Sequence, residues 1–136
     1  MSHSADDPEL MELATKLFNL ARAGETETLS AYVDAGVPVN LTNDSGDTLV
    51  MLAAYHGHAG AVTALLDRGA DPNRLNDRGQ APLAGAVFKS ESEVVRALVQ
   101  GGADPAYGQP SAVDTARMFG NDEMLAQLEE HRNPGG

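Results

Sequence analysis

The chain has 136 residues, of which 20 are Asp or Glu and 9 are Lys or Arg, so its formal net charge is −11. A chain this acidic repels phosphate backbones, and we therefore expect no nucleic-acid partner. The absence of Cys excludes disulfides, thiolate nucleophiles and cysteine-based metal sites. No apolar run reaches membrane-spanning length, and residues 1–12 are too polar for a secretory signal. We expect no membrane association and a cytoplasmic location.

Helix signals begin near the N-terminus. Asp7 and Pro8 are typical of an N-cap and a first helical position, and leucines then recur at helical spacing from residue 10 to residue 20. This first helix is predicted to be longer than the later ones. Further along, Thr48 is expected to cap a helix and Pro82 to begin another. The spacing of a capping box is found in Ser90 with Glu93 and in Ser111 with Asp114.

The chain also repeats itself. Gly36, Gly69 and Gly102 stand 33 residues apart, and the residues around them recur with them. Such a period marks stacked units, none of which buries its apolar face alone. Each of these glycines follows a predicted second helix, where a left-handed residue is common. We predict one domain over residues 7–132, in units 7–40, 41–73, 74–106 and 107–132, with the two end units acting as caps. Residues 1–6 and 133–136 are predicted to be disordered tails.

Two runs of residues resemble a known family. The run Gly-Asp-Thr-Leu-Val-Met-Leu-Ala-Ala-Tyr-His-Gly-His from Gly46, and Leu-Leu-Asp-Arg-Gly-Ala-Asp-Pro-Asn from Leu65, resemble the ankyrin repeat. The resemblance implies an all-α solenoid of stacked antiparallel helix pairs with short projecting β-turn or hairpin loops. It also implies a binding scaffold, in which Asn40 and Asn73 bond the neighbouring turn and His58 forms a local hydrogen bond at a helix start.

The family's Thr-Pro-Leu-His tetrad is incomplete in this chain. It reads Thr48-Leu49-Val50-Met51, Ala81-Pro82-Leu83-Ala84 and Ser111-Ala112-Val113-Asp114. Ala81 has no side-chain oxygen, so the helix after it lacks a cap worth about 1 kcal/mol. We therefore expect a stability below that of an idealised array.

One slot of the repeat forms a candidate binding strip. It is occupied by Arg22, Tyr55, Phe88 and Met118, and in the resembled family it faces the concave surface. Tyr55, Phe88 and Met118 are therefore expected to form an apolar strip that binds a partner. The alternative is that Phe88 and Met118 cover the core. The next slot adds His56, Lys89 and Phe119, and Phe119 has the same alternative.

The turn tips extend this candidate surface. The family's variable contact positions fall on Asp44, Ser45 and Asp47 in one turn and on Asp77, Arg78 and Gln80 in the next. Leu75 is apolar in a polar turn, which makes it a second anchor candidate. Its alternative is a contact with the adjacent hairpin. The acidic tips favour a partner with a basic patch.

The predicted function is a non-enzymatic module, monomeric alone, that binds another protein through its concave face and turn tips. The alternative is a structural protein that self-associates through an end unit. An enzyme would need a nucleophile with its base, a phosphate-binding loop or a metal cluster, and the sequence contains none of these patterns. His56 and His58 are two residues apart and do not share a helix face. We therefore expect no cofactor and no metal.

Overall fold

The computed structural model of the chain describes residues 8–132, without the side chains of the last two. Within this range there are eight helices. They are α1 (Pro8–Ala23), α2 (Thr26–Asp34), α3 (Leu49–Tyr55), α4 (Ala59–Asp67), α5 (Pro82–Phe88), α6 (Ser92–Gln100), α7 (Ala112–Met118) and α8 (Asp122–Arg132). The predicted tails, 1–6 and 133–136, and the predicted cap Asp7 lie outside the described residues.

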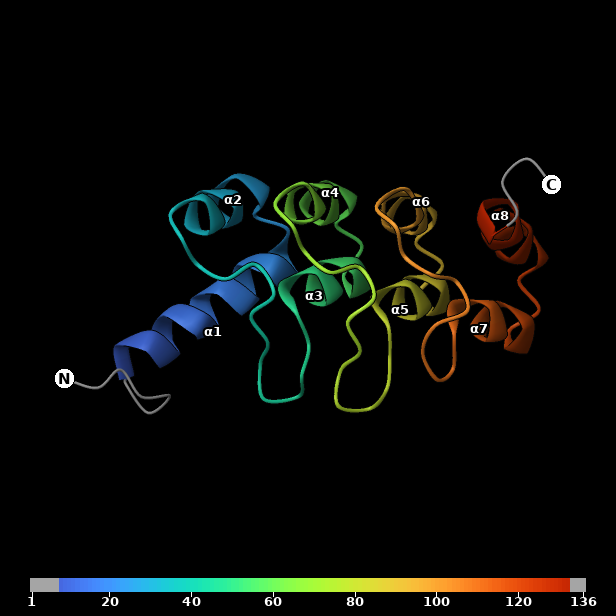
Figure 1. Cartoon of the computed structure of the whole chain (residues 1–136), viewed down its shortest axis with the longest axis horizontal. Helices are drawn as coiled ribbons and strands as arrows, with labels where there is room; N and C mark the ends of the chain where they lie inside the picture. Colours follow the sequence, from blue (N-terminus) through green and yellow to red (C-terminus); the bar gives the residue numbers. More distant parts are fainter. Residues whose placement is uncertain (1–7, 133–136) are drawn as a thin grey trace.

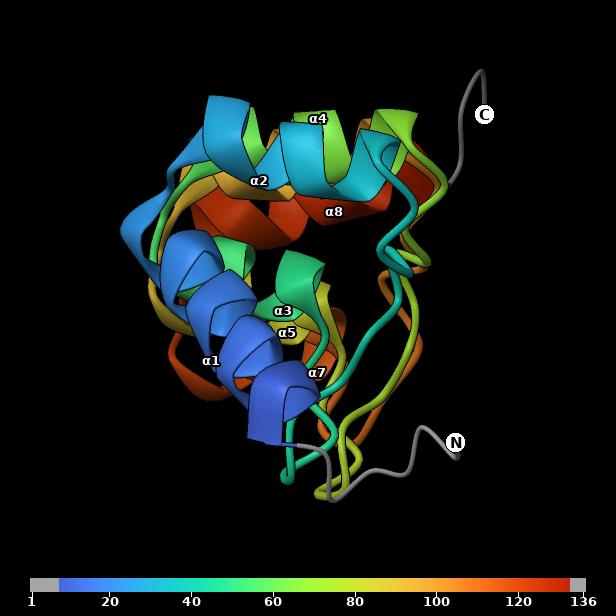
Figure 2. The same cartoon turned by 90° about the vertical axis from the view of Figure 1, so that its left-hand side faces the viewer.

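The helices form four antiparallel pairs that stack in one direction. In Figure 1 the first helices of the pairs, α1, α3, α5 and α7, make one row, and α2, α4, α6 and α8 make a second row. Figure 2 shows the two rows end-on as two layers, with the turns along one side. Residues 8–132 contain no strand, only isolated bridges between Thr42 and Thr48 and between Gly108 and Ser111. The predicted all-α solenoid is therefore confirmed.

The lengths of the helices follow the sequence signals. α1 has 16 residues, whereas α3, α5 and α7 have seven each, as the leucine spacing predicted. Gly36, Gly69 and Gly102 have φ angles of 118°, 94° and 100°. These values confirm that the chain leaves α2, α4 and α6 through left-handed glycines. The hydroxyl of Thr48 accepts a hydrogen bond from the Met51 amide at 3.2 Å and thereby caps α3.

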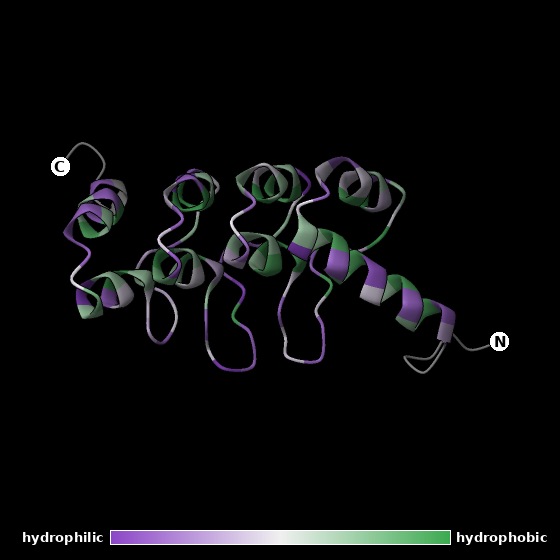
Figure 3. Ribbon diagram, turned by 180° about the vertical axis from the view of Figure 1, so that it is seen from behind, coloured by the Kyte–Doolittle hydropathy of each residue, from purple (hydrophilic) through white to green (hydrophobic). Residues whose placement is uncertain are grey.

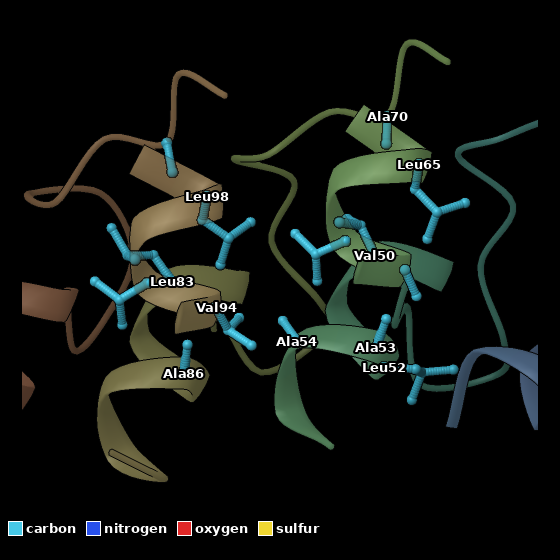
Figure 4. Packing of buried hydrophobic residues seen from close by; sticks show 14 of the residues in the cluster. Val50, Leu52, Ala53, Ala54, Leu65, Ala70, Leu83, Ala86, Val94 and Leu98 are labelled. Atoms are coloured by element: carbon cyan, nitrogen blue, oxygen red, sulfur yellow. The ribbon is translucent and has the colours of Figure 1, made fainter. Parts of the chain in front are cut away.

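The core lies between the two rows and consists of equivalent residues from successive units. Leu17, Val50, Leu83 and Val113 share one slot of the repeat, and all are buried. Ala53 and its equivalents in α5 and α7 are also buried, and their small side chains let the inner helices approach closely. Figure 4 shows Ala53 and Ala86 on the side of the inner helices that faces Leu65 of α4 and Val94 and Leu98 of α6. In Figure 3 every helix carries hydrophobic segments, whereas the projecting turns are mostly hydrophilic. Each fully buried Leu contributes about 2 kcal/mol.

The predicted capping box at Ser90 and Glu93 is wrong. α6 begins at Ser92, Glu91 is its N-cap residue without a side-chain cap, and Ser90 has a φ of 57°. The same slot in the other pairs holds Gly24, Gly57 and Gly120, all with positive φ. Ser90 therefore closes the end of α5 in a left-handed conformation, and it does not start α6.

Hydrogen bonds also join one pair to the next. Asn40 and Asn73 accept hydrogen bonds through Oδ1 from the amides of Asp71 and Asp104, each at 2.8 Å, so the predicted bonds between turns are confirmed. His58 does not act locally as expected. Its Nε2 lies 2.8 Å from the carbonyl oxygen of Arg22, and this hydrogen bond ties α4 to the end of α1.

Candidate functional site

A groove of about 640 Å³ runs along the inner helices where they meet the bases of the turns. Tyr55, Phe88 and Met118 all line it, so the three predicted strip residues come together on one surface. Their exposed fractions are 41%, 53% and 69%, and that of Phe119 is 62%. These side chains are not part of the core, and the alternative that they cover it does not hold.

The position of the strip follows from the repeat. Tyr55, Phe88 and Met118 are the last residues of α3, α5 and α7, which have equal lengths and lie side by side. Their side chains therefore fall in a row across three units. Small residues between them keep the groove open, because Ala84 and Gly85 also line it. A Cβ at Gly85 would come within 3.5 Å of the Tyr55 ring.

Neighbouring rings and one cation hold the aromatic side chains of the strip. The Phe88 and Phe119 rings meet edge to face, with centroids 5.4 Å apart. The Lys89 ammonium lies 5.0 Å from the centroid of the Tyr55 ring, within the range of a cation–π interaction. The Tyr55 and His56 rings also meet edge to face, with centroids 5.7 Å apart. Such contacts reduce the freedom that the rings would lose on binding.

Basic side chains collect where the inner helices end. Arg22 and His56 line the groove, and Lys89 lies over Tyr55. The pKa of the His56 imidazole lies below its usual value of 6.5, first because of partial burial and then because of His58, Arg22 and Lys89. A positive charge on His56 is thus disfavoured by its surroundings.

The predicted tip residues divide into two groups. Asp47, Arg78 and Gln80 line the groove together with the strip. Asp44, Ser45 and Asp77 are outside its lining and are exposed at the tips. The amide of Asp77 donates to the carbonyl of Ser45 at 3.0 Å, so adjacent tips are connected.

Leu75 lies apart from the strip. It is partly buried and lines a separate hollow with Tyr107 and Asp104 of the following turn. This position agrees with the alternative of a contact with the adjacent hairpin, and it separates Leu75 from the groove.

The sequence reasoning missed Asn76, which organises the turn side of the groove. Its side chain is 7% exposed, and its Nδ2 donates to Asp47 and Gln80 at 2.9 Å each. Its Oδ1 accepts from the amides of Arg78 and Gln80 at 3.0 Å. Asn43 makes the same kind of turn one unit earlier, because its Oδ1 accepts hydrogen bonds from the amides of Ser45 and Asp47. The recurrence of Asn after one period was the signal that could have identified it.

Among the described residues, no group of three or more His, Cys, Asp or Glu side chains comes together as a metal site. None of the helices within 8–132 combines the length and the apolar character needed to cross a membrane.

The comparison with known proteins agrees with this architecture. The family described as ankyrin repeats, in three copies, matches residues 17–108. The chain belongs to the ankyrin repeat family. Ankyrin repeats are generally protein–protein interaction modules rather than enzymes. The matched residues include Tyr55 and Phe88, whereas α7 and α8 follow the match.

A curated ankyrin repeat protein from Pseudomonas aeruginosa is 48% identical to this chain over 56 residues. The aligned segment covers 41% of this chain and 33% of that protein, so the likeness spans about a third of the relative's length.

Proposed function

We propose that this ankyrin repeat protein is a non-enzymatic module that binds another protein through its concave groove and turn tips. The observation that carries the proposal is the row of Tyr55, Phe88 and Met118, which are exposed side by side along one groove. Large apolar side chains gathered on one exposed surface mark interaction sites. The chain acts in the cytoplasm and is monomeric when alone.

The two parts of the surface have different roles in this proposal. Aromatic side chains in a hollow are typical of the residues that supply most of the binding energy. The exposed carboxylates of Asp44 and Asp77 at the tips instead steer association, and they favour a basic patch on the facing part of the partner. Arg78 and Gln80 line the groove next to the turn tips. In this proposal they contact the bound protein where the groove and the tips meet.

Affinity capture with purified protein tests the proposal. Phe88→Ala and Tyr55→Ala should each weaken binding of a captured partner by roughly thirtyfold, the effect of losing a hot spot of about 2 kcal/mol. The melting temperature should change little, because both rings are exposed. Tyr107→Ala is the matched control, since Tyr107 is an exposed aromatic residue outside the groove lining. Equal binding by the groove variants and the control would contradict the proposed site.

Self-association is the second candidate, and exposed residues of α1 favour it. Leu10 and Met11 are exposed by 45% and 56% near the start of that helix. Light scattering over a range of concentrations distinguishes the two functions. We expect a constant monomer mass. A mass that rises with concentration and returns to that of a monomer in Met11→Glu would favour self-association through α1.

A further inference from the structure

The charge of the groove is opposite to that of the whole chain. Acidic residues outnumber basic ones by 20 to 9 in the sequence. The groove lining instead includes Arg22 and Arg78 but only one carboxylate, Asp47. Lys89 adds a further cation above the Tyr55 ring. A partner that enters the groove therefore meets a local excess of positive charge.

Among the described residues, no carboxylate forms an ion pair with these cations. Arg68, Arg96 and Arg117, away from the groove, each pair with Asp or Glu at 2.9 to 4.0 Å. None of the ion pairs among the described residues involves Arg22, Arg78 or Lys89. The Arg22 guanidinium donates a hydrogen bond to the neutral side-chain amide of Asn19, at 2.9 Å.

The one carboxylate of the lining is already engaged. Asp47 accepts hydrogen bonds from Asn76 Nδ2 at 2.9 Å and from Asn43 Nδ2 at 3.5 Å. These bonds hold Asp47 against the turns and satisfy part of its acceptor capacity. Asp47 is thus fixed by the fold, whereas the cations keep donors free for a ligand.

The positions of the cations define the pattern that fits them. Arg22 lies in the last turn of α1, and Lys89 lies just after the end of α5, where the helix dipole favours a cation. Arg78 lies in the turn between α4 and α5. The apolar strip therefore has positive groups at the helix ends and another on the turn side.

We infer that the groove binds a partner segment in which an aromatic or aliphatic side chain is flanked by Asp or Glu. The apolar side chain would contact Tyr55, Phe88 and Met118, and the flanking carboxylates would face Arg22 and Arg78. This inference rests on the proposed function and adds the chemical class of the partner segment. It concerns the groove, whereas the preference for a basic patch concerns the tips.

Selection from a library of short random peptides, displayed on phage and captured by the purified protein, tests the inference. Peptides whose capture is lost in Phe88→Ala should be enriched in Asp and Glu around an apolar residue. The best of these, made synthetically with a fluorescent label, is then compared with its copy in which every acid is replaced by Lys. We expect the acidic peptide to bind at least tenfold more tightly, and its affinity to fall as salt is raised.

Charge reversals locate the contact. Arg22→Glu and Arg78→Glu should each weaken the acidic peptide by roughly fivefold or more. Arg96→Glu, on the exposed side of α6, is the matched control and should leave the affinity unchanged. Circular dichroism and thermal melting of each variant show that the fold is retained.

The outcomes separate this inference from the proposed function. Groove-dependent peptides that are basic or uncharged would overturn the inference and leave the proposed function intact. If no peptide depends on Phe88, both are overturned. Tighter binding of a single-stranded oligonucleotide than of the acidic peptide, with the same dependence on Arg22 and Arg78, would overturn the inference in favour of a nucleic acid.

Discussion

Ser90 is the one non-glycine residue with positive φ among residues 8–132. The left-handed conformation brings the Cβ of an L-residue close to its own backbone, at a cost of about 1 to 2 kcal/mol. Gly24, Gly57 and Gly120 avoid this cost in the equivalent slots. The α5–α6 pair therefore has backbone strain at Ser90 that the other three pairs lack at the equivalent position.

Replacing Ser90 by Gly should therefore raise the free energy of unfolding by about 1 kcal/mol. Urea unfolding followed by circular dichroism measures the change. The reverse substitution, Gly120→Ser, should lower stability by a similar amount, because no atom lies within 4 Å of a Cβ built there and only the backbone strain remains. If Ser90→Gly is neutral or destabilising, the serine is not strained in solution.

His56 offers a measurement at a single side chain. Its pKa should lie below 6.5, because partial burial and the nearby His58, Arg22 and Lys89 disfavour the imidazolium. Since the pKa is lowered in the folded state, His56 supports the fold above the unfolded pKa, and this support is lost as the pH falls through the folded pKa. Titration by NMR measures the value, and Arg22→Gln should bring it closer to 6.5. A pKa above 6.5 would contradict the arrangement of charges described for the groove.

At the scale of elements, the three seven-residue helices α3, α5 and α7 differ mainly in their N-cap residues. Thr48, Ala81 and Ser111 occupy the same slot before α3, α5 and α7. Thr48 and Ser111 accept hydrogen bonds from the amides three residues later, and Ala81 accepts none through its side chain. α5 thus begins with a favourable Pro82 but an unsatisfied first turn.

Ala81→Ser should add about 1 kcal/mol to the free energy of unfolding by supplying the missing acceptor. Serine is a better choice than threonine because the next turn is close. A Cβ built at Gly108 would lie 3.3 Å from the Ala81 Cβ. Ala81→Cys, of similar size but with a weak acceptor, is the matched control and should give little gain. If Cys and Ser have the same effect, size rather than capping determines it.

Sequence reasoning located the helices because local signals set their limits. The periodic glycines and the caps Thr48 and Ser111 depend only on nearby residues. Ser90 was misassigned because serine satisfies two local patterns, a cap and a turn, and only the tertiary structure selects one. The role of His58 depends on neighbouring units lying side by side, so no local pattern reveals it. Asn76 bonds mainly within its own turn, and the recurrence of Asn after one period was its only sequence signal. The strip was predictable because it repeats with the period, whereas the cationic groove combines slots that do not repeat as one motif.

At the scale of the whole molecule, the net charge of −11 opposes compaction through self-repulsion. The ion pairs found among the described residues are partly exposed and contribute little to stability. Screening of this repulsion by salt should therefore stabilise the fold. Raising sodium chloride from low to physiological concentration should increase the free energy of unfolding by on the order of 1 kcal/mol. A urea midpoint that falls with salt would show that attractive pairs outweigh the repulsion.

The stacked pairs make their main contacts with their immediate neighbours: α1 with α3, α3 with α5 and α5 with α7 in the inner row, and likewise in the outer row. Folding then needs only loops of about one repeat unit to close, which favours rapid folding. The groove, however, is lined by side chains of all four inner helices, including those of α7. Fraying of α7 and α8 would remove Met118 and Phe119 from its wall. A ligand that contacts these residues would therefore disfavour the opening of the α7–α8 pair, and slower hydrogen exchange in that pair would report that the groove is occupied.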